Sequence, residues 1–192
     1  MIRVALVGNI ASGKSTVEKF LAERGYIVLD TDVVCHNLLS LYKNTIIEAF
    51  KLYDIKNQSG DISREKLGKL VFGDKYLKRK LENIIHPLVK EYILDFFKKH
   101  KDEKFVFVSV PLLFEAGMED LFDKIIFIYS EDGLRLQRLL KRNNYTMEYA
   151  KRRLASQASQ EVKMNQSDFI LNNNSTLKCL EDNVSKLIEQ IR

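Results

Sequence analysis

Gly8-Asn9-Ile10-Ala11-Ser12-Gly13-Lys14-Ser15 is the stretch that decides the fold of this chain. It fits the pattern G-x-x-x-x-G-K-[ST], in which glycines let a loop curl so that backbone N–H groups surround phosphate oxygens. Residues 2–7 before it are apolar and partly β-branched, which is typical of a buried strand. Val17, Phe20 and Leu21 after it recur at helical spacing. A strand, this loop and a helix in that order predict a phosphate-binding P-loop.

The P-loop pattern predicts roles for individual residues of the loop. Lys14 is expected to reach the β- and γ-phosphates of a nucleotide, and the Ser15 hydroxyl is expected to ligate Mg²⁺. The start of the following helix adds the positive end of its dipole. The alternative is an ordinary glycine-containing turn between strand and helix that binds no phosphate, and the sequence context disfavours it. The predicted nucleotide-binding residues of the loop are Gly8, Asn9, Ile10, Ala11, Ser12, Gly13, Lys14, Ser15 and Thr16.

Composition excludes several classes of protein. The chain has 192 residues, 45% of them hydrophobic and 30% charged, with a formal net charge of +5, so we expect one globular domain with insertions. The basic cluster within residues 134–163 contains only two aromatic residues, Tyr145 and Tyr149, and lacks aromatic interleaving of the kind that stacks bases, which favours a phosphate-rich small ligand over nucleic acid. No apolar stretch is long enough to cross a membrane, and no signal-peptide pattern precedes the first strand. Cys35 and Cys179 lack metal-ligand spacing, so we expect two half-buried, reduced thiols and a cytoplasmic protein.

Strand-like and helical segments alternate along the chain. Strands are predicted at residues 2–7, 26–29, 105–110, 125–129 and 169–171, which favours an α/β fold with a parallel sheet and helices on both faces. The apolar stripe from Leu177 to Ile191 predicts the last helix, with Ser175 or Thr176 as its N-cap. A second helical region, with Thr146 as an N-cap, separates the last two strands and is interpreted as a mobile lid.

The gap between the second and third predicted strands is much longer than one crossover helix needs. It holds helical patterns at about 33–41, 44–53, 63–72 and 75–100 and a turn at residues 58–61, and Pro87 predicts a break or kink in the last of them. Ligands of open α/β sheets bind beyond the carboxyl ends of the strands, so this insertion is well placed to hold a second substrate.

Carboxylates near the ends of the predicted strands are candidates for chemistry. Asp30 and Asp32 could orient or deprotonate an acceptor hydroxyl, or hold Mg²⁺ through water, although Asp32 could also cap the next helix; we favour Asp32. Many P-loop proteins end the third strand with a metal-binding Asp, but Ser109 stands here. A metal-binding carboxylate must therefore come from elsewhere, with Asp32 and Glu115 the nearest candidates by motif position. A surface charge is an equal alternative for Glu115.

Arginines in the second helical region are candidates for phosphate binding. Arg138 and Arg142 are four residues apart, hence on one helical face, where they could clamp a triphosphate and stabilise charge during transfer. The alternative is a solvated basic face. His36 and His86, taken alone, are more often structural than catalytic.

Taken together, these motifs resemble the dephospho-coenzyme A kinase family along nearly the whole chain. The P-loop is similar to the family's loop, with Ala11 where a Gly often stands, and residues 30–32 resemble its D-A-D element. Residues 60–72, 85–87 and 110–115 resemble its G-x-I-x-R-x-x-L-x-x-x-V-F, I-H-P and V-P-L-L-F-E segments. The lid and C-terminal patterns of the family are matched by Arg138, Arg142, Arg153, Gln157, Asp168 and Asn173.

The resemblance implies a P-loop NTPase-type three-layer fold and transfer of phosphate from ATP to the ribose 3′-hydroxyl of dephospho-CoA, with Mg²⁺. It implies Asp32, Lys14 and Arg142 as catalytic residues, and Arg138, Arg142 and Asn173 as further nucleotide contacts. On the acceptor side it implies Asp32, Arg64, His86 and Glu115. The expected partners are these small molecules, not nucleic acid or membrane, with the chain a monomer or weak homo-oligomer. The family usually has Asp at position 109, and Ser175 replaces a frequent Gly.

The resemblance also implies three functional regions. A nucleotide-binding core is expected from residues 1–32, 103–133 and 166–192, a helical acceptor domain from 33–102, and a lid from 134–165. Two other classes are weaker alternatives. A P-loop nucleotide switch of the GTPase type would carry D-x-x-G and N-K-x-D elements, which are absent from the sequence. A nucleoside monophosphate kinase would not account for the V-P-L-L-F-E and I-H-P segments.

Overall fold

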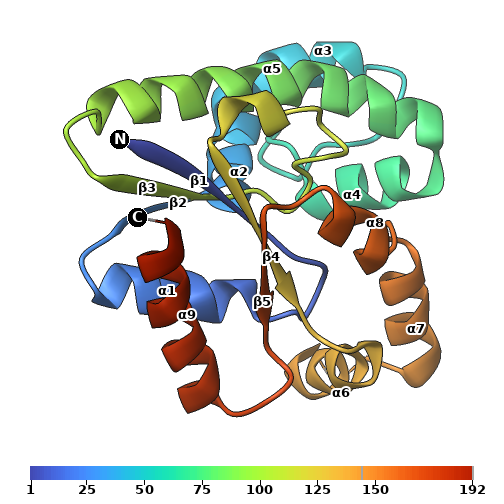
Figure 1. The fold of residues 1–192 in the computed structure, drawn as a ribbon. Coiled ribbons are helices and arrows are strands. Elements are labelled where there is room, and N and C mark those ends of the chain that lie inside the picture. The colour runs from blue at the N-terminus through green and yellow to red at the C-terminus, as the bar shows by residue number, and fades with distance from the viewer. Residues whose placement is uncertain (144, 192) are drawn as a thin grey trace. The chain divides into compact units, whose positions relative to one another are not determined.

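Five mostly apolar segments form a parallel sheet (Figure 1), seen in a computed structural model that describes residues 1–143 and 145–191. Its strands are β1 (Ile2–Val7), β2 (Ile27–Asp30), β3 (Phe105–Ser109), β4 (Lys124–Tyr129) and β5 (Phe169–Asn172). Their order is β2-β3-β1-β4-β5, and every neighbouring pair is parallel. The predicted α/β fold and its strands are confirmed. Because Ser109 pairs with both Leu6 and Asp30, the carboxyl ends of three strands meet at one edge.

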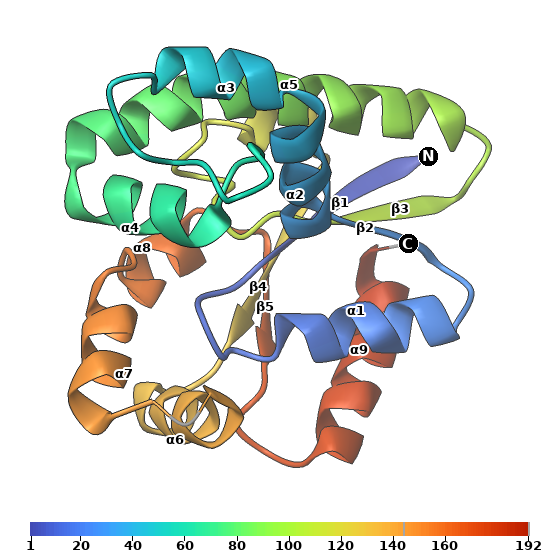
Figure 2. The same cartoon turned by 180° about the vertical axis from the view of Figure 1, so that it is seen from behind.

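The sheet belongs to one of two compact units, which comprises residues 1–30 and 100–192. The inner strands are buried, and two helices, α1 (Lys14–Glu23) and α9 (Leu177–Ile191), pack against each other beside them (Figures 1 and 2). The apolar stripe that the sequence predicts is buried from Leu180 to Ile191, whereas Leu177 at the start of α9 is exposed; Thr176 caps the helix by accepting a hydrogen bond from Cys179 N at 3.2 Å. The buried stripe therefore fastens the last helix to the same core as the helix that follows the P-loop.

The same unit contains the helices between β4 and β5. They are α6 (Asp132–Asn143), α7 (Met147–Ala155) and α8 (Gln160–Asn165), and the short helix η1 (Glu119–Leu121) precedes β4. Thr146 caps α7 as predicted, because its side chain accepts a hydrogen bond from Tyr149 N. Helix α8 contacts β4, and Gln160 at its start donates to the carbonyl of Ser130, directly after the carboxyl end of β4.

The second unit, residues 31–99, is helical. It consists of α2 (Thr31–Leu41), α3 (Lys43–Ala49), α4 (Arg64–Gly73) and α5 (Lys75–Lys99), and both α2 and α4 contact α5. Ser63 caps α4 by accepting a bond from Lys66 N. The turn predicted at residues 58–61 is present, with Gly60 at a φ of +81° and its N–H bonded to the Asn57 carbonyl. The long insertion is therefore a helical unit of its own.

The predicted helix break at Pro87 is wrong. Helix α5 runs through Pro87 without interruption over 25 residues. Pro87 lacks the N–H that would bond the carbonyl of Asn83, but both residues are exposed. Water can therefore satisfy that carbonyl, while the apolar face of α5 continues through Ile85 and Val89.

Two smaller findings concern the membrane and the thiols. Among residues 1–143 and 145–191, no helix combines the length and the apolar character that crossing a bilayer requires. Both cysteines are thiols; Cys35 is half-buried as predicted, whereas Cys179 is exposed, in the first turn of α9 close to its capping residue Thr176.

Candidate active site

The P-loop, residues 8–15, joins β1 to α1, and its glycines are required by space and backbone conformation. A side chain at Gly8 would meet Ser12 Oγ and the Ile128 carbonyl, and one at Gly13 would collide with the Asn173 amide. Gly13 has a φ of +98° and precedes α1 without any side-chain cap. Because Gly13 has no side chain, the residue before α1 cannot cap the first N–H groups of the helix, which is the arrangement that binds phosphate oxygens.

Lys14 at the start of α1 lies in a compact group of polar side chains. Its ammonium donates to Glu18 Oε1 at 2.8 Å and to the Ser109 hydroxyl at the end of β3. Ser109 in turn donates to the same Glu18 oxygen at 2.6 Å. The side chains of Lys14 and Glu18 are each only 14% exposed, so this pair is largely shielded from water. The P-loop lysine is thus held between a carboxylate on its own helix and a hydroxyl on β3.

The outer side of the P-loop is fastened by the α7–α8 linker and by α6. Gln157 Oε1 accepts the Ile10 N–H at 2.7 Å, and Arg135 Nε donates to the Ile10 carbonyl at 3.0 Å. Asn9 Nδ2 donates to the Ala158 carbonyl at 2.9 Å. Arg135 is 2% exposed, and this burial lowers the pKa of its guanidinium while Asp132 raises it. Part of the segment predicted as a lid therefore supports the P-loop backbone directly.

Arg138 and Asn173 converge on the Ser12 carbonyl. Asn173 Nδ2 donates to it at 2.7 Å, and Arg138 Nη1 approaches it at 3.5 Å. Arg138 also donates to Ser130 Oγ at 3.0 Å and to the Asn173 carbonyl at 2.9 Å. Two predicted nucleotide contacts thus lie at the P-loop, whereas Arg142, one turn further along α6, is exposed.

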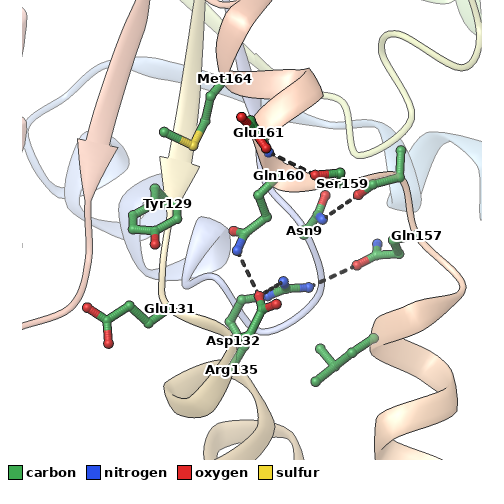
Figure 3. A pocket seen from close by; sticks show the side chains of 12 residues that line it. Asn9, Tyr129, Glu131, Asp132, Arg135, Gln157, Ser159, Gln160, Glu161 and Met164 are labelled. Atoms are coloured by element: carbon green, nitrogen blue, oxygen red, sulfur yellow. Dashed lines mark hydrogen bonds and ion pairs between the residues drawn. The ribbon is translucent and has the colours of Figure 1, made fainter.

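A cavity of about 670 Å³ opens beside this fastened side of the loop (Figure 3). Figure 3 shows Arg135 between Asp132 and Gln157, with Gln160 bonded to Asp132. The side-chain oxygens of Asn9 and Gln160 have no hydrogen-bond partner within the part of the chain that the structure describes.

Glu115, predicted on the acceptor side, follows β3 and pairs with a buried lysine. Lys163 Nζ on α8 lies 2.7 Å from Glu115 Oε1, as an ion pair rather than a well-angled hydrogen bond. The Lys163 side chain is 2% exposed and that of Glu115 is 33% exposed. Glu115 is therefore held in place at the surface by a cation from beneath.

The remaining predicted acceptor residues lie in the helical unit. Asp32 is exposed in the first turn of α2, and His86 is half-buried on α5. Arg64 donates to His36 Nδ1 at 2.7 Å, which requires the ring proton of a neutral His36 to be on Nε2. Both line a cavity of about 370 Å³ together with Lys43, which pairs with Asp61 at 2.6 Å. This cavity gathers two cationic side chains, Lys43 from α3 and Arg64 from α4.

Comparisons with known proteins decide the family. A family profile of dephospho-CoA kinases matches residues 2–178. The dephospho-CoA kinase of Listeria monocytogenes serovar 1/2a is 36% identical over 97% of this chain and 96% of its own length. The chain belongs to the dephospho-CoA kinase family. A solved dephospho-CoA kinase from Campylobacter jejuni is 30% identical, with a TM-score of 0.76 over 98% of this chain and 96% of that one.

A shikimate kinase from Acinetobacter baumannii shares the fold, with a TM-score of 0.58 at 17% identity, covering 100% of this chain and 93% of its own. Membership of the dephospho-CoA kinase family confirms the resemblance that the sequence motifs carry. It also removes the two alternatives, a GTPase-type switch and a nucleoside monophosphate kinase.

Sequence reasoning missed three side chains of this family member that the structure places at the site. Glu18, Arg135 and Lys163 lie beside Lys14, Ile10 and Glu115 respectively. Arg135 and Lys163 belong to the basic cluster, but that pattern carries no signal of their burial. For Glu18 one signal was available, because a residue four positions after Lys14 shares its helical face.

Proposed function

We propose that this chain transfers the γ-phosphoryl group of ATP to the ribose 3′-hydroxyl of dephospho-CoA, giving CoA and ADP in CoA biosynthesis. The observation that carries the proposal is the full-length family match around a P-loop with Lys14 at the start of α1. Phosphoryl transfer needs little covalent chemistry from the protein, because positioning and electrostatic stabilisation do most of the work.

On the donor side, the loop from Gly8 to Thr16 would bind the phosphates of ATP through its backbone N–H groups. Lys14 would neutralise the β- and γ-phosphates. Arg138 and Asn173 would keep the loop in shape from behind while bordering the nucleotide, since both already bond the Ser12 carbonyl. Arg142, exposed on α6, would stabilise the charge that develops during transfer.

The oxygen donors near the P-loop fit Mg²⁺. Ser15 has an exposed hydroxyl at the start of α1, and Glu18 and Ser109 add a carboxylate and a second hydroxyl. Among the described residues no three His, Cys, Asp or Glu side chains form a metal-binding group. That suits Mg²⁺, which is usually held by one or two protein oxygens and the substrate phosphates. Ser15 would be a ligand of the ion, which would supply positive charge that neutralises the phosphates.

On the acceptor side, we assign Asp32, Arg64, His86 and Glu115 to dephospho-CoA. Asp32 would orient the 3′-hydroxyl and accept its proton, because it is an exposed carboxylate at the start of a helix. Dephospho-CoA carries a diphosphate between its adenosine and pantetheine parts, and this anion suits the cavity that Arg64 and Lys43 line. Arg64 would bind it through the guanidinium that now faces His36.

These assignments divide the chain into three working regions. Residues 1–32, 103–133 and 166–192 would bind ATP, residues 33–102 would bind dephospho-CoA, and residues 134–165 would close over the phosphates. We further propose that the protein works in the cytoplasm as a monomer or weak homo-oligomer. The two cysteine thiols are consistent with a reducing compartment.

An acceptor panel tests the proposed function. ADP release from ATP is measured with dephospho-CoA, adenosine, AMP and pantetheine phosphate as acceptors. We expect turnover with dephospho-CoA alone, because only that acceptor offers both the ribose hydroxyl and the diphosphate. Turnover with AMP but not with dephospho-CoA would refute the proposal.

A further inference from the structure

The end of strand β3 carries an unusual polar group for a P-loop enzyme. The position where such enzymes supply a metal-binding carboxylate is occupied by Ser109, at the edge where β1, β2 and β3 end. A carboxylate from another element lies beside Ser109 and could take over this role. Glu18 comes from α1, and its Oε1 lies 2.6 Å from the Ser109 hydroxyl.

We propose that Glu18 is the carboxylate of the metal side of the nucleotide site, moved from the end of β3 to the first helix. Ser109 holds it there by donating its hydroxyl proton to Glu18 Oε1, the same oxygen that accepts from Lys14 at 2.8 Å. The inference deepens the proposed function and rests on it. It makes Glu18 and Ser109 a unit that does the work of a single carboxylate.

Charge and burial favour this assignment over a merely structural ion pair. The Lys14 and Glu18 side chains are 14% exposed, whereas the next pair along the same helix, Lys19 and Glu23, is 72% and 57% exposed. An ammonium has three protons, and Lys14 gives two of them to Glu18 and Ser109, so the third remains for a phosphate oxygen. The Glu18 carboxylate would then offset part of the positive charge that Lys14 and a cation bring together.

The test compares Glu18→Gln with Glu23→Gln, a matched change on the same helix that removes an exposed carboxylate. Mn²⁺ serves as the probe of the metal site, and its binding to the complex of protein and a non-hydrolysable ATP analogue is followed by electron paramagnetic resonance. Affinity for the analogue alone is measured in parallel with chelator. A relocation variant, Glu18→Gln with Ser109→Asp, returns one carboxylate to the end of β3.

We expect Glu18→Gln to weaken Mn²⁺ binding by about tenfold or more and Glu23→Gln to leave it unchanged. The relocation variant should recover most of the loss. Without metal, Glu18→Gln should bind the analogue at least as tightly as the unmodified chain, because a negative charge beside the phosphates is gone. Circular dichroism checks that each variant is folded. If Glu18→Gln unfolds, Glu18→Asp replaces it, because that change keeps the charge. The Asp side chain is shorter, so Glu18→Asp should still weaken Mn²⁺ binding, although by less than is expected of Glu18→Gln.

Wild-type Mn²⁺ affinity in the folded Glu18 variant would overturn the inference. So would an equal loss of analogue affinity with and without metal, since that result describes a residue that only orients Lys14. The test needs no acceptor. A chain that binds Mn²⁺ in the expected pattern but does not phosphorylate dephospho-CoA would therefore refute the proposed function and support the role of Glu18.

Discussion

At the scale of single residues, Ala11 bears backbone strain inside the P-loop. Its φ is +62°, a region that suits glycine and costs other residues roughly 1 kcal/mol. We expect Ala11→Gly to raise the free energy of unfolding by up to about 1 kcal/mol, measured by urea denaturation. Ala22→Gly, in regular α1, should lower it by about as much. Destabilisation by both changes would show that Ala11 is not strained.

The proposed role of Asp32 can be tested directly by enzyme kinetics. Asn keeps the size of Asp and a side-chain carbonyl oxygen, but it cannot accept a proton from the 3′-hydroxyl. We expect Asp32→Asn to lower kcat by about a hundredfold or more, while ATP affinity measured by calorimetry stays the same. Equal losses in kcat and ATP affinity would assign Asp32 to the nucleotide or its metal instead.

Local pattern predicts some site residues and not others, for a physical reason. The P-loop could be predicted because its glycines and Lys14 are set by backbone geometry within one short segment. The contact between Glu18 and Ser109 could not, because it joins residues 91 positions apart and depends on side-chain rotamers. The burial of Lys163 against Glu115 could not be predicted from the sequence for the same reason.

At the scale of elements, the linker between α7 and α8 supports the loop that binds phosphate. Gln157 Oε1 accepts the Ile10 N–H at 2.7 Å, so Gln157→Leu would leave that donor without an acceptor. We expect a loss of about 1–3 kcal/mol in unfolding free energy and weaker ATP binding. Gln137→Leu, on the exposed side of α6, is the control and should change neither quantity. Unchanged ATP affinity in Gln157→Leu would separate the linker from the P-loop.

The starts of β1 and β4 are joined by Arg3 and Asp123. Arg3 donates to Asp123 through Nη2 at 2.6 Å and Nε at 3.0 Å, and this bonding lowers the pKa of Asp123 below its usual 3.8. The carboxylate therefore adds stability above that value, and the gain is lost as pH falls through the lowered pKa.

Asp123→Asn should cost about 1 kcal/mol or less near neutral pH, because both side chains are about a third exposed. Urea denaturation at a series of pH values should show the difference shrinking below pH 3.8, the ordinary pKa of Asp. Glu148→Gln, which breaks an exposed pair on α7, is the control and should have little effect. A difference that grows as pH falls would contradict the assignment.

Strands and amphipathic helices could largely be predicted, because the spacing of apolar residues along the sequence and the apolar content of each segment determine them. The error at Pro87 has a different origin. The rule that Pro ends a helix ignores exposure, and α5 can tolerate Pro87 because both Pro87 and Asn83, whose carbonyl Pro87 cannot bond, are exposed residues.

At the scale of the whole molecule, two compact units suggest two separable tasks. Arg64→Ala, in the helical unit, should raise KM for dephospho-CoA about tenfold or more, because a charge-assisted contact to the diphosphate is lost. ATP affinity should stay the same. Arg79→Ala removes an exposed cation of the same unit and is the control. A parallel loss of ATP affinity in Arg64→Ala would contradict the division of tasks.

Our main proposal is that the γ-phosphoryl group of ATP is transferred to a single hydroxyl of dephospho-CoA, the ribose 3′-hydroxyl. The most direct measurement is phosphorus NMR of the reaction with dephospho-CoA and with its 3′-deoxy analogue, with ADP counted in parallel. We expect one new phosphomonoester on the 3′-oxygen for each ADP formed, and none with the analogue. A phosphomonoester elsewhere, or ADP with inorganic phosphate and no ester, would contradict it.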